Sequence, residues 1–236
     1  MEKISDIKTL TEEELKNWLK EVGEKPFRAD QIRNRLFCGQ VKSFNEMETI
    51  PAALREKLSA NFRITSLEEA KRLLSEDGTV KWLYRTHDGH HIETVLIPTN
   101  DRFSVCVSTQ IGCAQNCAFC RTAKMGFIRN LEAGEILEEI IRVNWYLEET
   151  GTKHSDGSLA KVTNIIFMGM GEPLNNLEQV HRVCCTLHHQ KLFNLGRKRM
   201  TISTSGVVPK IKELVDRNTP CCLAVSLNST NDERRS

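Results

Sequence analysis

The second half of the sequence alternates between strand-like and helix-like hydrophobic patterns, and this alternation restricts the possible folds more than any other feature. Four apolar runs have strand length, and they lie at residues 103–108, 162–168, 199–203 and 222–227. Between them, apolar residues recur with helical spacing at residues 132–149, 177–189 and 209–217. Strands joined through helices in this way form parallel sheets or barrels, whose ligands bind at the carboxyl ends of the strands. The sequence therefore predicts an α/β fold with its site at that edge.

The first 65 residues predict a small helical module. Apolar residues recur with helical spacing at residues 12–22, at 27–37 and again between residues 46 and 61. Thr11 and Glu14 have the spacing of a capping box at the start of the first helix. The second segment carries three arginines, which suit either the phosphate backbone of RNA or simply solvent.

Residues 66–98 change to the period of β-strands, with Asp-Gly turns at Gly78 and Gly89. This pattern predicts a β meander between the helical module and the α/β part. We therefore expect three parts: a helical, RNA-binding-like module at residues 1–65, a β-meander linker at 66–98 and an α/β core at 99–236.

Charge and cysteine content exclude several classes of protein. Lysines and arginines (33) nearly balance aspartates and glutamates (31), so a surface that binds nucleic acid must be local. The N-terminus lacks the pattern of a signal peptide and no apolar run is long enough to span a bilayer, so we expect a cytoplasmic protein without membrane contact. In a reducing compartment, nine cysteines are better explained as metal ligands, redox groups or buried side chains than as disulfides.

Three of the cysteines, Cys113, Cys117 and Cys120, lie in one short loop after the first predicted strand. Thiolates are soft ligands, which favour zinc or an iron-sulfur cluster over calcium or magnesium. A structural zinc site has four protein ligands, whereas three protein ligands leave one position of the metal open. We therefore expect a metal centre with an open position. The alternative is a non-catalytic zinc-binding RNA module in which Cys106 or a histidine completes the site.

Small and polar residues follow the other predicted strands. The second strand ends in the sequence of residues 168–173, where Gly171 lets a ligand approach the backbone and Glu172 can accept hydrogen bonds from an amine. The third strand ends in residues 203–206 and the fourth in residues 226–228. Their hydroxyl and amide groups suit the ribose and carboxylate oxygens of a small molecule.

Other polar groups and cysteines have simpler explanations. The three cations of residues 197–199 precede the third strand and suit RNA phosphate and solvent equally well. The histidines near the second Asp-Gly turn are best explained as polar turn residues and the later cysteines as core residues; they are His87, His90, His91, Cys184, Cys185, Cys221 and Cys222.

The cysteine spacing, with Phe119 before the last cysteine, resembles that of radical S-adenosylmethionine (SAM) enzymes. The surrounding sequence resembles, more specifically, the RNA adenine-C2 methyltransferases of the RlmN type. The segments that carry this resemblance are residues 92–98, 106–113, 126–131, 169–174 and 203–209. The related carbon-8 methyltransferases are the alternative, and Gln110-Ile111-Gly112 before the first cysteine favours the C2 branch.

The resemblance implies a partial (β/α) TIM-like radical SAM barrel and assigns roles to particular residues. It implies a 4Fe-4S cluster on Cys113, Cys117 and Cys120, with SAM on the open iron, and SAM contacts from Gly171, Glu172, Ser203, Ser226, Leu227 and Asn228. It assigns proton acceptance to Glu93, and to Cys106 a transient disulfide with a methyl-carrying cysteine. It also implies 23S ribosomal RNA and transfer RNA as substrates, a cytosolic electron donor such as flavodoxin, and a monomer.

The family continues for roughly two more strand–helix units and then carries the methyl-accepting cysteine, whereas this sequence stops at Ser236, soon after the fourth predicted strand. We therefore expect an N-terminal fragment or a truncated gene product without its methyl carrier. A remnant that folds poorly is a third possibility. Ala123 stands where the family has glycine, and Asn228 stands where histidine is common.

Overall fold

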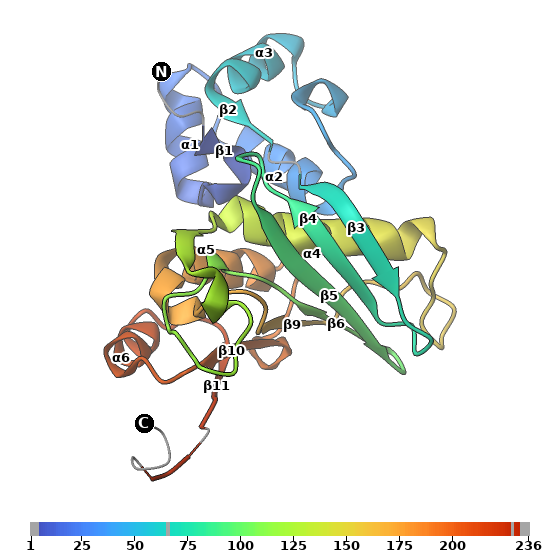
Figure 1. Cartoon of the computed structure of the whole chain (residues 1–236). Helices are drawn as coiled ribbons and strands as arrows, with labels where there is room; N and C mark the ends of the chain where they lie inside the picture. The colour runs from blue at the N-terminus through green and yellow to red at the C-terminus, as the bar shows by residue number, and fades with distance from the viewer. Residues whose placement is uncertain (1–4, 65–66, 228, 232–236) are drawn as a thin grey trace.

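A single seven-stranded sheet runs through the molecule (Figure 1). The computed structural model describes residues 5–64, 67–227 and 229–231. The strand order is β11-β10-β9-β6-β5-β4-β3, and neighbours in the second half, from β6 to β11, are parallel. These four strands are β6 (Arg102–Cys106), β9 (Asn164–Phe167), β10 (Met200–Thr204) and β11 (Cys222–Val225). The connections between successive parallel strands run through the helices α4 (Ala133–Glu149), α5 (Leu177–His188) and α6 (Val208–Asp216). The predicted α/β alternation is confirmed.

The β meander is part of the same sheet. Its strands are β3 (Glu68–Leu74), β4 (Val80–Arg85) and β5 (His91–Thr99), all antiparallel to their neighbours. Because β5 also pairs with β6, in a register that places Val95 opposite Cys106, the sheet continues across residue 98. The expected linker at 66–98 is therefore an antiparallel extension of the core. β5 and β6 are joined by the two-residue turn Asn100-Asp101 and pair as a hairpin, so a boundary at residue 98 falls inside one local unit of the sheet.

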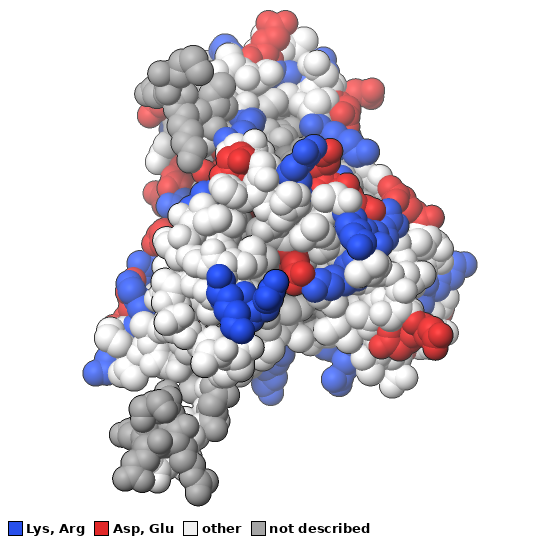
Figure 2. All heavy atoms as spheres, in the orientation of Figure 1, with Lys and Arg blue, Asp and Glu red and all other residues white. Residues whose placement is uncertain are grey.

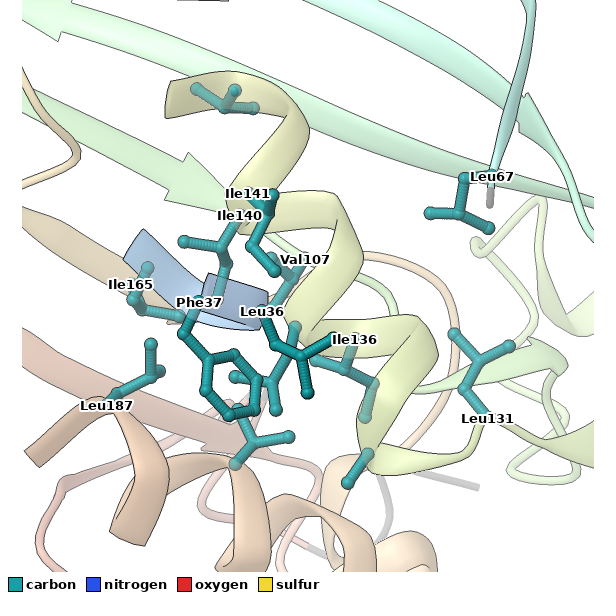
Figure 3. Packing of buried hydrophobic residues seen from close by; sticks show 14 of the residues in the cluster. Leu36, Phe37, Leu67, Val107, Leu131, Ile136, Ile140, Ile141, Ile165 and Leu187 are labelled. Carbon is teal, nitrogen blue, oxygen red and sulfur yellow. The ribbon is translucent and has the colours of Figure 1, made fainter. Parts of the chain in front are cut away.

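The two faces of the sheet differ in burial. On one face, residues such as Val105, Ile165 and Ile202 are fully buried in the core beneath α4 and α5. On the other face, Cys106, Ile166 and Ser203 are only half-buried. Figure 3 shows the buried side, where Ile165 lies in the same cluster as side chains from α4 and α5. The half-buried face is the one on which polar groups can meet a ligand.

The helical module consists of α1 (Glu12–Glu21), α2 (Arg28–Cys38) and α3 (Ala52–Asn61), closed by the short parallel pair β1 (Ser5–Asp6) and β2 (Phe62–Arg63). The predicted capping box is confirmed, since the Glu14 amide donates to Thr11 Oγ1 and the Thr11 amide donates to the Glu14 carboxylate.

The module packs on the outer side of α4. Leu36 and Phe37 of α2 lie among side chains of α4 and α5 in one continuous core (Figure 3). Lys8 Nζ donates to the Glu138 carboxylate at 2.7 Å, and both side chains are buried. Gly134 is required here, because a Cβ atom would lie 2.2 Å from Asp6 Oδ2. Helix α4 is thus covered on both sides. Within the described ranges, none of the helices is long and apolar enough to cross a bilayer.

Candidate functional site

The three cysteines of the predicted metal loop lie within a β-hairpin, which we call the cysteine hairpin (residues 110–130). Its strands are β7 (Gln110–Gly112) and β8 (Phe127–Asn130), which pair antiparallel. The Cys113 amide donates to Gly126 O at 3.1 Å and closes the loop between them. The sequence predicted the loop but not the hairpin, because β7 and β8 are too short to show a strand period.

Three cysteine thiols lie in the hairpin. Cys113 is buried, Cys117 and Cys120 are half-buried, and the Gln115 amide donates to Cys113 Sγ at 3.5 Å. Among the residues that the structure describes, no three His, Cys, Asp or Glu side chains are grouped to hold one metal ion. Thiolate sulfur is the ligand that iron-sulfur clusters take in proteins. By the chemistry of its donors, the hairpin therefore fits an iron-sulfur cluster.

The glycine turn after β9 packs tightly against the segment that leads into the hairpin. A Cβ atom at Gly169 would lie 2.6 Å from Val107 O, and one at Gly171 would lie 2.5 Å from Gln110 Cβ. Met170 O accepts hydrogen bonds from the amides of Thr109 and Gln110, at 2.8 and 3.1 Å. These glycines therefore allow the turn to approach the chain itself, and the Met170 carbonyl already accepts two hydrogen bonds from backbone amides.

Glu172 joins three strand ends and is only 4% exposed. Its carboxylate accepts hydrogen bonds from the Leu174 amide at 3.1 Å, the Ser205 amide at 2.8 Å and Ser205 Oγ at 2.9 Å. Its own amide donates to Gln110 Oε1 at 2.8 Å. A carboxylate has about four acceptor positions, so about one remains for an amine. Glu172 thus organises the site at least as much as it offers an open binding group.

The half-buried face of the sheet brings other predicted residues together. Ser203 Oγ and Ser226 Oγ lie 3.2 Å apart, at the ends of β10 and β11. Leu227 is exposed beside them, and Asn228 lies outside the described residues. On β5, the Glu93 carboxylate lies 2.7 Å from Lys81 Nζ, a neighbour that sequence spacing did not reveal.

Cys106 lies on the same half-buried face as Glu93, since it is opposite Val95 in the register. Burial raises the pKa of Cys106 to about 11, partly offset by a hydrogen bond from the Met168 amide. Because only the thiolate reacts with electrophiles, this thiol is protected at neutral pH.

We expect alkylation of Cys106 by iodoacetamide to accelerate about tenfold per pH unit from pH 7 to near 11. Peptide mass spectrometry of timed samples measures this rate for each cysteine separately. In the urea-unfolded chain, the same thiol should react much faster at pH 8. Equal rates for the folded and unfolded chains at that pH would contradict the burial argument.

Arg129 of β8 anchors the cysteine hairpin and was missed by the sequence interpretation. Its guanidinium donates to both oxygens of Glu135 on α4, at 2.7 and 2.8 Å, and to both oxygens of Asp88 in the β4–β5 turn, at 2.7 and 3.0 Å. Arg129 holds the pKa of Asp88 well below its usual range. His87 has its Nδ1 atom 3.6 Å from the Glu135 carboxylate. The charged pairs of Arg129 with Glu135 and Asp88 therefore hold the hairpin against α4 and the β4–β5 turn.

The later cysteines are only partly core residues. Cys184 and Cys221 are buried as predicted, whereas Cys185 is exposed and Cys222 is half-buried. On a helix the next residue points about 100° away, so Cys185 faces out where Cys184 faces in. Cys222 lies on the edge strand β11. The cations of residues 197–199 are in a short 3-10 helix, where Arg197 donates to Cys221 O and Arg199 to Asn164.

A row of parallel strands with a three-cysteine loop at the end of its first strand is the arrangement of a radical SAM domain. The family described as "Radical SAM superfamily" matches residues 107–236. The chain belongs to the radical SAM superfamily. The family described as "Ribosomal RNA large subunit methyltransferase N-terminal domain" matches residues 5–64, so within the superfamily the chain is of the RlmN type.

Individual relatives agree with both matches. The dual-specificity RNA methyltransferase RlmN of Anaeromyxobacter dehalogenans is 44% identical over 230 residues, which cover 98% of this chain and 61% of the relative. The probable dual-specificity RNA methyltransferase RlmN of Bacillus subtilis is 42% identical over 224 residues, which cover 95% of this chain and 60% of the relative. The chain thus spans about 60% of the length of these relatives.

One solved structure has the same fold. The crystal structure of a radical SAM methyltransferase from Sphaerobacter thermophilus superposes with a TM-score of 0.88 at 39% identity. The match covers 98% of this chain and 66% of that chain. It therefore includes the helical module as well as the sheet.

Proposed function

We propose that this chain forms the cluster- and SAM-binding part of an RNA methyltransferase that modifies carbon 2 of adenine in ribosomal and transfer RNA. The observation that carries the proposal is the cysteine hairpin that follows β6, in the same sheet whose strands β10 and β11 end at the Ser203–Ser226 pair. The RlmN-type helical module and the names of the relatives support RNA as the substrate.

The residues divide into three groups by what they offer. Cys113, Cys117 and Cys120 would hold a 4Fe-4S cluster, which supplies the single electron that cleaves SAM and opens radical chemistry at an unreactive aromatic carbon. Ser203 and Ser226 present hydroxyl groups to the oxygens of SAM. Further SAM contacts are proposed for Gly171, Glu172, Leu227 and Asn228.

On the half-buried face, Glu93 is proposed to accept a proton, and Cys106 is proposed to form the transient disulfide that releases the methylated base. An ionised Glu93 can accept the ring proton of the base, provided that Lys81 shares its carboxylate with the substrate. Cys106 must lose its proton before it can attack another sulfur. Since burial raises its pKa to about 11, a group in the complete complex has to remove that proton or stabilise the thiolate.

The RNA target is proposed to be unpaired, because a stacked base could not reach the strand ends. The face seen in Figure 2 carries separate groups of lysines and arginines among acidic and uncharged side chains, with no continuous basic surface on that face. On this face, therefore, RNA phosphate would meet separate local groups of cations and not a continuous basic surface. A cytosolic reductant such as flavodoxin is the proposed electron donor, and the cytoplasm the proposed location.

Anaerobic purification tests the proposal. We expect a brown protein with about four irons and four sulfides per chain, because a 4Fe-4S cluster has that composition. Cys117→Ala should lose most of the iron, whereas Cys185→Ala, which changes an exposed cysteine on α5, should keep it. A colourless protein that contains one zinc ion would overturn the radical SAM proposal in favour of a zinc-binding RNA module.

A further inference from the structure

Helix α4 carries three buried carboxylates, and for one of them, Glu139, the described residues supply no cationic partner. Glu135 is bonded to Arg129, and Glu138 lies 2.7 Å from Lys8 Nζ and 2.8 Å from Arg142 Nε. Glu139 is 0% exposed, and its hydrogen bonds are to neutral groups, Thr94 Oγ1 at 2.5 Å and the Ser108 amide at 3.1 and 3.2 Å. Burial raises the pKa of Glu139 well above its usual value.

Ser108 is the residue at which the chain leaves the sheet. Strand β6 ends at Cys106, so the Ser108 amide has no strand partner and is satisfied by Glu139. The Ser108 hydroxyl donates to Glu93 O at 2.7 Å and accepts from the Met170 amide at 3.0 Å. One residue held by Glu139 therefore connects β5, the end of β6 and the glycine turn.

We propose that Glu139 is a positioning residue that fixes Ser108 and thereby the mutual placement of Glu93, Cys106 and the glycine turn. The proposal rests on the proposed function for the roles of Glu93 and Cys106. Glu139 would act from the buried side of the sheet, opposite the half-buried face where the substrate is expected.

The uncharged form of Glu139, which burial favours by raising the pKa, suits this task. A negative charge on Glu139 would oppose a thiolate at Cys106, because the two groups interact electrostatically through the sheet. The other titratable groups that act on Glu139 or respond to it are Glu135 on the same helix and Tyr84 on β4. Glutamine has nearly the same shape and stays neutral. Its side chain can accept a hydrogen bond from the Ser108 amide and donate one to Thr94 Oγ1, so Glu139→Gln should keep the positioning role.

The test compares Glu139→Gln and Glu139→Leu with Glu138→Gln, which changes the adjacent buried carboxylate that faces the helical module. The first measurement is the rate of Cys106 alkylation at pH 8 in the folded chain. The second uses the reduced, cluster-loaded protein, whose electron paramagnetic resonance spectrum is titrated with SAM to find the concentration that gives half of the spectral change. We expect E139Q to keep both within about twofold, and E139L to raise both about tenfold, because the Ser108 amide loses its acceptor. E138Q should lower stability and leave both unchanged.

Two results would overturn the proposal. Either E139Q matches E139L, which would show that a charged carboxylate is needed, or E139L changes neither quantity. Should E139L fail to fold, Ser108→Ala takes its place, because it breaks the hydrogen bonds to Glu93 O and from the Met170 amide. We expect S108A to accelerate Cys106 alkylation and E139Q to leave the rate unchanged. An unchanged rate in S108A would reject the proposal. Since alkylation requires neither cluster nor SAM, a chain that binds no iron can still confirm the positioning role while the proposed function fails.

Discussion

Replacement of Gly112 by alanine is expected to open the cysteine hairpin. Gly112 has φ +74°, and a Cβ atom there would lie 1.7 Å from Gly126 O, a backbone atom that cannot rotate away. That oxygen also accepts the Cys113 amide, so the clash falls on the contact that closes the cysteine loop. We expect a loss of about 3 kcal/mol in the free energy of unfolding, because overpacking and an unfavourable backbone angle add. Urea unfolding and iron content after anaerobic purification measure the effect.

Gly126→Ala provides the matched control. Gly126 has almost the same backbone angle, φ +73°, but no atom lies within 4 Å of the place where its Cβ would be. At Gly126, where ψ is 175°, the alanine should therefore cost only the strain of a backbone conformation that favours glycine, about 1–3 kcal/mol, and the protein should keep most of its iron. Equal losses for the two variants would show that backbone angle, and not the close approach to Gly126 O, makes Gly112 necessary.

Arg129→Met is expected to have the other large effect. It removes two hydrogen bonds from Glu135, whose side chain is 0% exposed, and leaves that carboxylate with the Glu132 amide at 2.9 Å and His87 Nδ1 at 3.6 Å. A buried charge that loses its partner typically costs about 3–5 kcal/mol. Urea unfolding at pH 7 should show a loss of that size.

The pH dependence gives a second measurement. Arg129 lowers the pKa of Asp88, so this contact stabilises the fold above the unfolded pKa of about 3.9 and is lost as pH falls through the lowered value. The difference between wild type and R129M should therefore shrink below about pH 4. Arg85→Met is the control, since Arg85 pairs with Glu68 at the exposed edge and should cost less than about 1 kcal/mol. Equal losses for R129M and R85M would contradict the assigned burial.

Local patterns predicted the elements of the core well, because each depends on neighbours in the sequence. The capping box at Thr11, the Asp-Gly turns at Gly78 and Gly89 and the four parallel strands all lie close to the expected positions. The pairing of β5 with β6 is also local, because the two strands form a hairpin around Asn100 and Asp101, but this turn lacks the glycine that marks the other two turns. The residues predicted as a linker are continuous with the core sheet through this hairpin.

In the candidate site, too, the sequence pattern indicated some residues and not others. Spacing alone identified the cysteine loop, and strand ends identified Ser203 and Ser226, which the structure brings within 3.2 Å. The supporting residues gave no signal. Glu135 and Glu139 resemble the solvated side of an amphipathic helix in sequence, but the helical module covers α4 from outside and the sheet covers it from inside.

The double cover of α4 has a mechanical consequence. Glu138 points to the helical module and contacts Lys8, while the next residue, Glu139, points to the sheet and holds Ser108. Consecutive residues of one rigid helix cannot move independently. Any displacement of the module that pulls on Lys8 therefore also shifts the carboxyl group under the strand ends. Lys8 in the helical module and Ser108 beneath the strand ends are therefore joined mechanically through one turn of α4.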